Sequence, residues 1–110
     1  MNKQDIEKGR NNAIISYITI IGVVIAYFLN NDAEKKSAFT SFHVRQSLGL
    51  WLTFYALGYI VGGFDSWLVS SSFYLFFAIL FIYGLVSAIG RKAQTVPLVG
   101  AFYQKLFANI

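Results

Sequence analysis

The chain has no cysteine, one proline and one histidine, and only 13% of its 110 residues are charged. The absence of cysteine excludes disulfides, thiolate nucleophiles and cysteine-ligated metals. With one histidine and few acids near it, a histidine-based metal site or a catalytic triad lacks its components. A glycine-rich phosphate loop, a nucleophile elbow and zinc-ligand spacing are also missing. We therefore expect a protein that is not an enzyme and that uses no cofactor or metal.

Charge is absent altogether from three long stretches of the chain. They extend from Asn11 to Asn31, from Gln46 to Phe64 and from Ser66 to Gly90. Each has about 20 residues or more, the length of helix that crosses a ~30 Å hydrocarbon core. Hydrophobic residues make up 56% of the chain, and only helices and closed barrels satisfy their backbone hydrogen bonds in lipid. The sequence predicts an all-α, polytopic integral membrane protein, built as one helical domain over residues 1–110.

Three transmembrane helices are expected, at about residues 13–30, 42–63 and 70–90. The first is rich in isoleucine and valine, but strands would leave unpaired edges in lipid, so a helix is the better interpretation. Gly22 near its middle permits a kink or a re-entrant hairpin, and this alternative to a straight span stays open. Thr40 or Ser41 is the expected N-cap of the second helix. The third ends at Gly90, where cations follow that suit a helix C-terminus.

A shorter amphipathic helix is expected after the last span, at about residues 96–108. Thr95 can cap it and Pro97 can open it, and it is too short to cross a membrane. Its apolar residues share one face: Val99, Phe102, Tyr103, Leu106 and Phe107. We expect this helix to lie in the membrane interface, with Gln104 and Lys105 toward water.

The distribution of lysine and arginine indicates the orientation of the chain. Three lie before the first apolar stretch, three between the first and second spans, none beside Asp65 between the second and third, and three after Gly90. The turn with Asp65 therefore belongs outside. A spanning first helix puts the N-terminus outside, whereas a re-entrant one puts all basic residues inside; length favours the former and the positive-inside rule the latter. With a net charge of +4, we expect contact with anionic lipid headgroups and not with nucleic acid.

Small residues four positions apart give each predicted span one smooth face. The pairs are Gly22 and Ala26, Gly58 and Gly62, and Gly84 and Ala88. Membrane helices associate by close packing, and such pairs allow their backbones to approach. The faces serve either a partner subunit or the packing of this protein's own helices. The second reading is favoured, because short helices must bury some surface against each other.

His43, Arg45 and Gln46 form the only cluster of polar chemistry next to a predicted span. They either cap and snorkel at the interface, or Arg45 makes a charge-assisted contact with a carboxylate, a lipid phosphate or the C-terminal segment. We expect the Phe42–Gln46 turn and the Pro97–Phe107 helix to lie together at the cytoplasmic interface. His43 or Arg45 would then donate to backbone carbonyls near Gly90 or Pro97.

The segment AFTSFHVRQSL at residues 38–48, followed by two apolar spans and then TVPLVG at 95–100, resembles a bacterial family of small membrane proteins of unknown function. That family is itself similar to the Tic-type import component of the chloroplast inner envelope. The matching residues are Phe42, His43, Gln46, Pro97 and Gly100, and the resemblance covers about residues 12–107. It implies a multi-pass protein of the bacterial inner membrane with a link to protein export or insertion.

Taken together, these features predict a non-catalytic subunit or accessory protein of a larger inner-membrane assembly, whose partners are the lipid bilayer and other membrane subunits. The alternative is a homo-oligomeric pore or small-solute carrier, lined by polar side chains of the spans such as Ser16, Thr19, Thr53 and Tyr55. These side chains are scattered and form no single polar stripe, which favours the accessory subunit.

Overall fold

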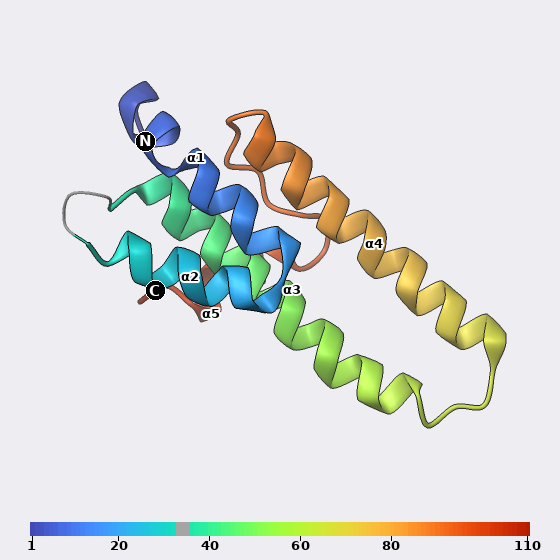
Figure 1. Ribbon diagram of the computed structural model, residues 1–110. Helices are drawn as coiled ribbons and strands as arrows, with labels where there is room; N and C mark the ends of the chain where they lie inside the picture. Colours follow the sequence, from blue (N-terminus) through green and yellow to red (C-terminus); the bar gives the residue numbers. More distant parts are fainter. Residues whose placement is uncertain (33–35) are drawn as a thin grey trace.

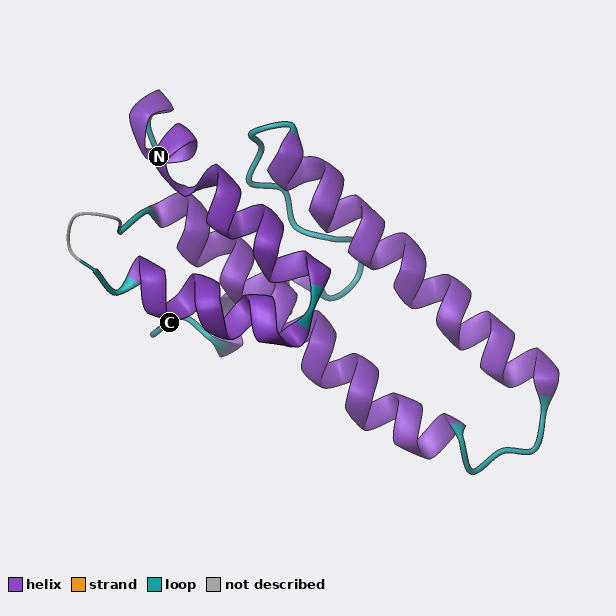
Figure 2. Ribbon diagram, viewed as in Figure 1, coloured by secondary structure: helices purple, strands orange, loops and turns teal. Residues whose placement is uncertain are grey.

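In the computed structural model, which describes residues 1–32 and 36–110, the described chain forms five α-helices (Figures 1 and 2). They are α1 (Lys3–Ile18), α2 (Ile20–Asn30), α3 (Ala38–Val61), α4 (Trp67–Ile89) and α5 (Gly100–Leu106). The predicted all-α class is confirmed, because no strand occurs among the described residues.

Two antiparallel helical hairpins make up most of the molecule, and α5 belongs to neither. The long hairpin consists of α3 and α4, and the short hairpin consists of α1 and α2 (Figure 1). The short hairpin packs on the first half of α3, α1 also contacts the last half of α4, and α5 lies against α3. The far end of the long hairpin extends beyond this body, so the molecule measures 49 × 23 × 22 Å.

The prediction of one continuous helix over residues 13–30 is wrong. The chain breaks at Thr19, whose backbone is extended with φ −149° and ψ 162°, and then turns back on itself. The Thr19 hydroxyl accepts a hydrogen bond from the Gly22 N–H at 2.9 Å and so caps α2. A Cβ on Gly22 would lie 2.1 Å from the carbonyl oxygen of Ile15. Gly22 therefore allows the close approach of the two helices, but the break itself occurs at the capping threonine.

The second predicted helix begins earlier than expected, because α1 supplies part of its cap. Ser37, and not Thr40 or Ser41, is the N-cap of α3, and its hydroxyl accepts a hydrogen bond from the Thr40 N–H at 3.3 Å. The carboxylate of Asp5 accepts the N–H groups of Ala38 and Phe39 at 3.0 and 2.9 Å. These groups would otherwise be unpaired at the helix start.

The last helix is shorter than predicted. Thr95 and Pro97 do not open it, because Leu98 adopts φ 74° and this left-handed conformation interrupts any helix that starts before it. α5 begins at Gly100 and ends at Leu106, within the predicted range of 96–108. The third predicted helix agrees more closely with the structure, since α4 ends at Ile89 and Gly90 is its C-cap.

The hydrophobic core lies where the short hairpin meets α3, α4 and the chain around α5. Its buried residues are Ala13, Tyr17, Phe39, Leu50, Phe77, Leu80, Ala88, Val96 and Tyr103. A smaller cluster between α2 and α3 contains Val23, Ala26 and Val44. The core thus occupies the end of the long hairpin that carries both chain termini (Figure 1).

Within residues 1–32 and 36–110, α4 is the one helix that is long and apolar enough to cross a membrane, with a mean hydropathy of 2.2. α2 is apolar but has only 11 residues. The first turns of α3 carry polar side chains that lower its hydropathy, and these side chains form the site described next.

Candidate functional site

A buried polar network joins α1, α3 and the chain segment that links α4 to α5. It consists of the side chains of Tyr17, His43 and Gln46 together with backbone groups of Lys92, Gln94 and Val96. The His43 and Gln46 side chains are fully buried, and Tyr17 is 4% exposed. Buried polar groups of this kind are costly unless each is paired, and here they pair with one another.

Gln46 connects the most groups in this network. Its amide nitrogen donates to the Tyr17 hydroxyl at 2.9 Å and to the Gln94 carbonyl at 3.1 Å. Its amide oxygen accepts the Val96 N–H at 2.8 Å. A single side chain therefore holds the segment after α4 against α3 and α1.

The protonation of His43 follows from its hydrogen-bond partners. Its Nε2 lies 2.9 Å from the Lys92 carbonyl oxygen, which can only accept, so Nε2 carries the proton and donates. Its Nδ1, 2.6 Å from the Tyr17 hydroxyl, accepts in the neutral tautomer. The rings of Tyr17, Phe39 and Phe42 pack edge-on around the imidazole. Both ring nitrogens are thus engaged inside the protein, as suits a structural role.

The expected proximity of the Phe42–Gln46 turn to the C-terminal segment is observed. The Gln104 amide donates to the Phe42 carbonyl at 2.8 Å, and Arg45 Nη2 donates to the Ala108 carbonyl at 3.3 Å. Gly100 lies against Gln46, because a Cβ there would be 2.9 Å from Gln46 Oε1. Pro97 follows Val96 directly and makes the turn toward α5. The six residues singled out from the sequence, Phe42, His43, Arg45, Gln46, Pro97 and Gly100, therefore lie in one region.

The small residues of the predicted smooth faces have different roles. A Cβ on Gly84 would lie 2.5 Å from the Tyr17 ring, so α1 and α4 meet closely there. Ala26 and Ala88 are fully buried. At Gly58 a Cβ would meet the Phe73 ring at 3.5 Å, an ordinary contact.

Gly62 does not pack against another helix. A Cβ there would meet backbone oxygens of its own helix, the nearest at 3.3 Å. Two other glycines that the sequence did not single out permit close contacts. A Cβ on Gly9 would lie 2.3 Å from the hydroxyls of Ser37 and Thr40, and one on Gly49 would lie 2.3 Å from the Tyr103 ring. No local pattern marks these two, because their neighbours come from distant parts of the chain.

Charged side chains of α1 bind the start of α3 and the end of α4. Arg10 donates to the Ile89 carbonyl at 3.0 Å, and Arg91 forms an ion pair with Glu7. Asp5 caps α3 as described above. Burial raises the pKa of Asp5, whereas hydrogen bonds from Phe39, Ala38 and Ser37 lower it. The hydrogen bonds together have the larger effect, so the pKa of Asp5 lies below the ordinary value of 3.8.

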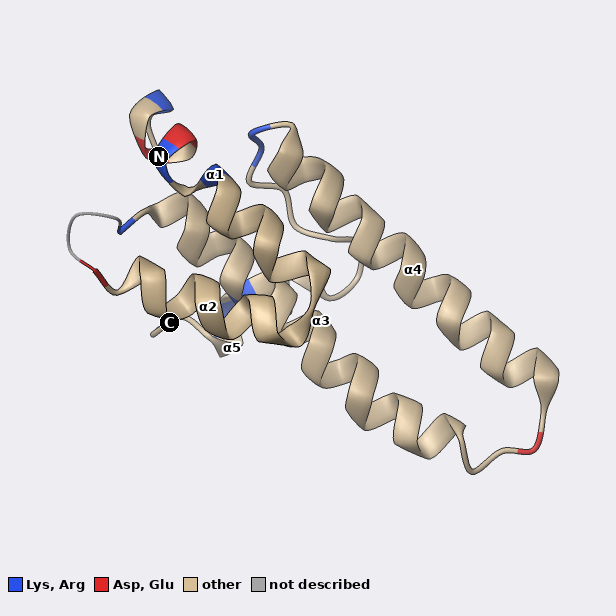
Figure 3. Cartoon of the chain, in the orientation of Figure 1, with Lys and Arg blue, Asp and Glu red and all other residues tan. Residues whose placement is uncertain are grey.

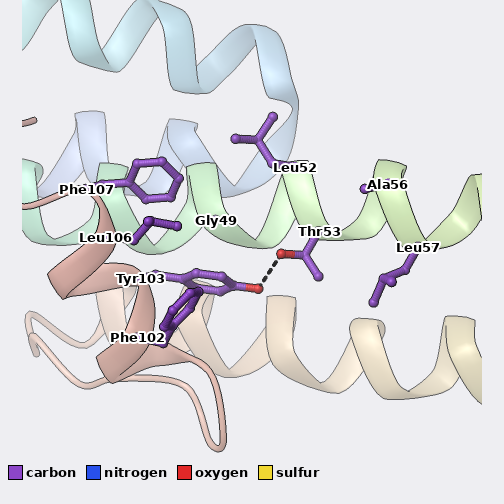
Figure 4. Close-up of a pocket in the computed structure, with 9 residues that line it drawn as sticks. All are labelled: Gly49, Leu52, Thr53, Ala56, Leu57, Phe102, Tyr103, Leu106 and Phe107. Atoms are coloured by element: carbon purple, nitrogen blue, oxygen red, sulfur yellow. Dashed lines mark hydrogen bonds between the residues drawn. The ribbon is translucent and has the colours of Figure 1, made fainter.

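A groove of about 330 Å³ lies between α3 and α5 (Figure 4). Its lining residues are Gly49, Leu52, Thr53, Ala56, Leu57, Phe102, Tyr103, Leu106 and Phe107. The Tyr103 hydroxyl donates to the Thr53 hydroxyl at 2.7 Å, so the two polar groups of the lining are paired with each other. The groove is therefore an apolar surface.

In the part of the chain that the structure describes, no group of three or more His, Cys, Asp or Glu side chains is placed to hold a metal ion. Comparison of the chain with protein families, with curated proteins and with solved structures gives no match.

Proposed function

We propose that this chain is a non-catalytic subunit or accessory protein of a bacterial inner-membrane assembly, held in the bilayer by the α3–α4 hairpin. The distribution of apolar surface carries the proposal. In the outer halves of α3 and α4 large apolar side chains face outward; Tyr59, Trp67 and Leu68 are 88%, 84% and 71% exposed. Soluble monomers rarely expose continuous apolar surfaces of this kind, so lipid or a membrane partner is the natural cover.

The distribution of charge supports the same placement. Among the described residues, Asp65 is the single charged residue at the far turn of the long hairpin, and the others gather toward the opposite end (Figure 3). α3 and α4 have 24 and 23 residues. At ~1.5 Å per residue each measures ~35 Å, which is sufficient to cross a ~30 Å hydrocarbon core.

The polar residues in the first turns of α3 are compatible with this placement. His43 and Gln46 bond to α1 and to the 92–96 segment, and the Thr40 hydroxyl donates to the Gly9 carbonyl at 3.0 Å. These groups face protein, and polar groups at membrane depth are tolerated when protein surrounds them. The low hydropathy of this part of α3 thus comes from side chains that lipid would not contact.

We further propose that the short hairpin enters the bilayer part way from the charged side. A broken helix at membrane depth needs partners for its freed carbonyls, and the Trp51 indole N–H donates to the Ser16 carbonyl at 3.1 Å, beside the break. This arrangement puts the N-terminus on the same side as Lys36. All described lysines and arginines then share one side, which the positive-inside rule assigns to the cytoplasm.

The hydrogen bonds of the polar side chains in the helices favour the assembly role over the pore alternative. The Ser16 hydroxyl donates to the Ala13 carbonyl, Thr19 caps α2, and Thr53 bonds to Tyr103. Side chains occupied in this way do not line a shared path, so the accessory role is better supported. The link to protein export or insertion rests on the resemblance of the Phe42–Gln46 and Pro97–Gly100 segments alone.

Single-cysteine variants test the membrane placement directly, because the chain has no cysteine. We propose Lys3→Cys, Lys36→Cys and Asp65→Cys, each treated with a membrane-impermeant thiol reagent on intact cells. The expected result is labelling at position 65 alone, with all three labelled after the cells are opened. Labelling at position 3 on intact cells would place the N-terminus outside and contradict the partial insertion of the short hairpin. Extraction of the protein by alkaline carbonate would contradict membrane insertion altogether.

Purification from native membranes in a mild detergent, followed by mass spectrometry of the co-purifying chains, tests the assembly role. A defined set of membrane proteins that is absent from a mock purification is the expected result. Recovery of this chain as an isolated monomer would contradict it. A homo-oligomer that conducts a solute in liposomes would establish the pore alternative instead.

A further inference from the structure

Arg45 is a partly buried cation near the start of α3. It makes one hydrogen bond, from Nη2 to the Ala108 carbonyl at 3.3 Å, and its Nε is buried without a partner. Among the residues that the structure describes, no carboxylate pairs with it. The remaining N–H groups on the Nη atoms of Arg45 can donate in parallel to an anion with two oxygens, such as a phosphate.

The lining of the apolar groove between α3 and α5 starts one helical turn along α3 from this cation. Gly49, at the near end of the groove, lies one helical turn after Arg45, and Phe107 on the other wall precedes the Ala108 carbonyl that Arg45 contacts. From Gly49 the groove follows α3 past Thr53 to Leu57, in the direction of the far turn (Figure 4). These eight residue steps correspond to ~12 Å of helix at ~1.5 Å per residue.

We propose that Arg45 and this groove bind one anionic phospholipid, with the phosphate on Arg45 and an acyl chain along the groove. The proposal rests on the membrane placement proposed above, which puts Arg45 near the level of the headgroups and the groove in the acyl region. Lys105, in the last turn of α5, is a second cation three residues before the Ala108 carbonyl that Arg45 contacts. A zwitterionic lipid presents an ammonium group to these cations and is disfavoured, and a free phosphate leaves the groove unused.

Native mass spectrometry of the full-length protein in a non-ionic detergent tests the charge preference. The protein is titrated with phosphatidylglycerol or with phosphatidylcholine of the same acyl chains. We expect about tenfold tighter binding of the first phosphatidylglycerol molecule, the effect of one charge-assisted contact. Arg45→Gln should remove the preference and Arg45→Lys should retain most of it. Lys36→Gln, a charge removed before the start of α3, should leave it unchanged.

A pair of matched substitutions tests the acyl groove. Ala56→Phe fills the groove between α3 and α5, whereas Ala78→Phe places the same side chain in a different apolar groove, beside Trp51 and Phe81. We expect Ala56→Phe to weaken the first binding step of both lipids at least severalfold, and Ala78→Phe to leave it unchanged. Glycerol phosphate, which has no acyl chain, should not displace the bound lipid at equal concentration.

Several results would overturn the lipid site. They are equal affinity of the native chain for both lipids, an unchanged preference in Arg45→Gln, unweakened binding in Ala56→Phe, or displacement by glycerol phosphate. Circular dichroism and gel filtration identify a variant that has failed to fold, and Arg45→Lys then decides the role of the charge. Loss of the lipid preference with intact labelling at Asp65→Cys would reject the lipid site alone, whereas loss of the membrane topology would reject both proposals.

Discussion

Replacement of Gln46 by leucine tests whether the buried polar network holds the C-terminal segment on the body of the protein. The substitution removes the two hydrogen bonds to Tyr17 and Gln94 and the one from Val96. Each such bond contributes about 0.5 to 1.5 kcal/mol, and the buried Val96 N–H left without an acceptor costs about 1 to 3 kcal/mol. The apolar volume of leucine recovers part of this loss. We expect a net destabilisation of about 3 kcal/mol.

The free energy of unfolding of Gln46→Leu can be measured by titration with sodium dodecyl sulfate in mixed micelles, followed by tryptophan fluorescence. Hydrogen exchange gives an independent measure, because the Val96 amide should exchange much faster in the variant. Ser47→Ala is the matched control, since the Ser47 hydroxyl bonds only to the Val44 carbonyl of its own helix at 3.2 Å. The free energy of unfolding of this control should fall by less than about 1 kcal/mol.

If the free energy of unfolding of Gln46→Leu lies within about 0.5 kcal/mol of that of the native chain, the network does not hold the C-terminal segment. This is the scatter expected of substitutions that break no specific contact. Unchanged exchange at Val96 would show that the segment is held by other contacts. A destabilisation of Ser47→Ala as large as that of Gln46→Leu would mean that any loss of a hydroxyl or amide in this turn has the same effect.

Three further predictions use the same unfolding titration. The free energy of unfolding of Gly84→Ala should fall by about 1 to 3 kcal/mol, because the new Cβ overlaps the Tyr17 ring. That of Gly58→Ala should be unchanged or rise by up to about 1 kcal/mol from helix propensity. Equal effects would rule out Gly84 as a close contact. Trp51→Phe should lose about 1 kcal/mol, because the Ser16 carbonyl loses its donor, and an unchanged value would show that this carbonyl is satisfied otherwise. Since the pKa of Asp5 lies below 3.8 in the folded protein, its contribution is complete above that pH and is lost as the pH falls through the folded-state value; Asp5→Asn should show a smaller acid-induced loss than the native chain, and identical pH profiles would contradict this.

The positions of the helices were predicted best where local signals are strong. The end of α4 at Ile89 agrees with the glycine and cations that follow it. The start of α3 was placed too late, because part of its cap comes from Asp5, which is more than 30 residues away in the sequence. A capping partner at that distance leaves no trace in the local pattern.

The candidate site was predicted in outline and not in detail. The proximity of the Phe42–Gln46 turn to the segment around Pro97 follows from the antiparallel connection of two helices of similar length. The participation of Tyr17 did not follow, because it depends on how α1 lies on α3. For the same reason Gly9 and Gly49 were missed. Of the glycines predicted to pack closely, Gly84 permits a close contact with the Tyr17 ring, whereas Gly58 makes an ordinary contact with Phe73.

The chain's apolar, charge-free stretches and their lengths determine that it folds as helices and which residues prefer to leave water, because solvent preference and helix propensity act within a few residues. They do not determine whether residues 13–30 run straight or fold back. The local sequence suits both forms, because Thr19 can be a helix residue or a cap. Contacts with distant residues stabilise the broken form: Trp51 satisfies the Ser16 carbonyl, and His43 pairs with Tyr17, 26 residues earlier in the chain. Such contacts exist only once α1 and α3 lie side by side, and for that reason the tertiary fold decides them.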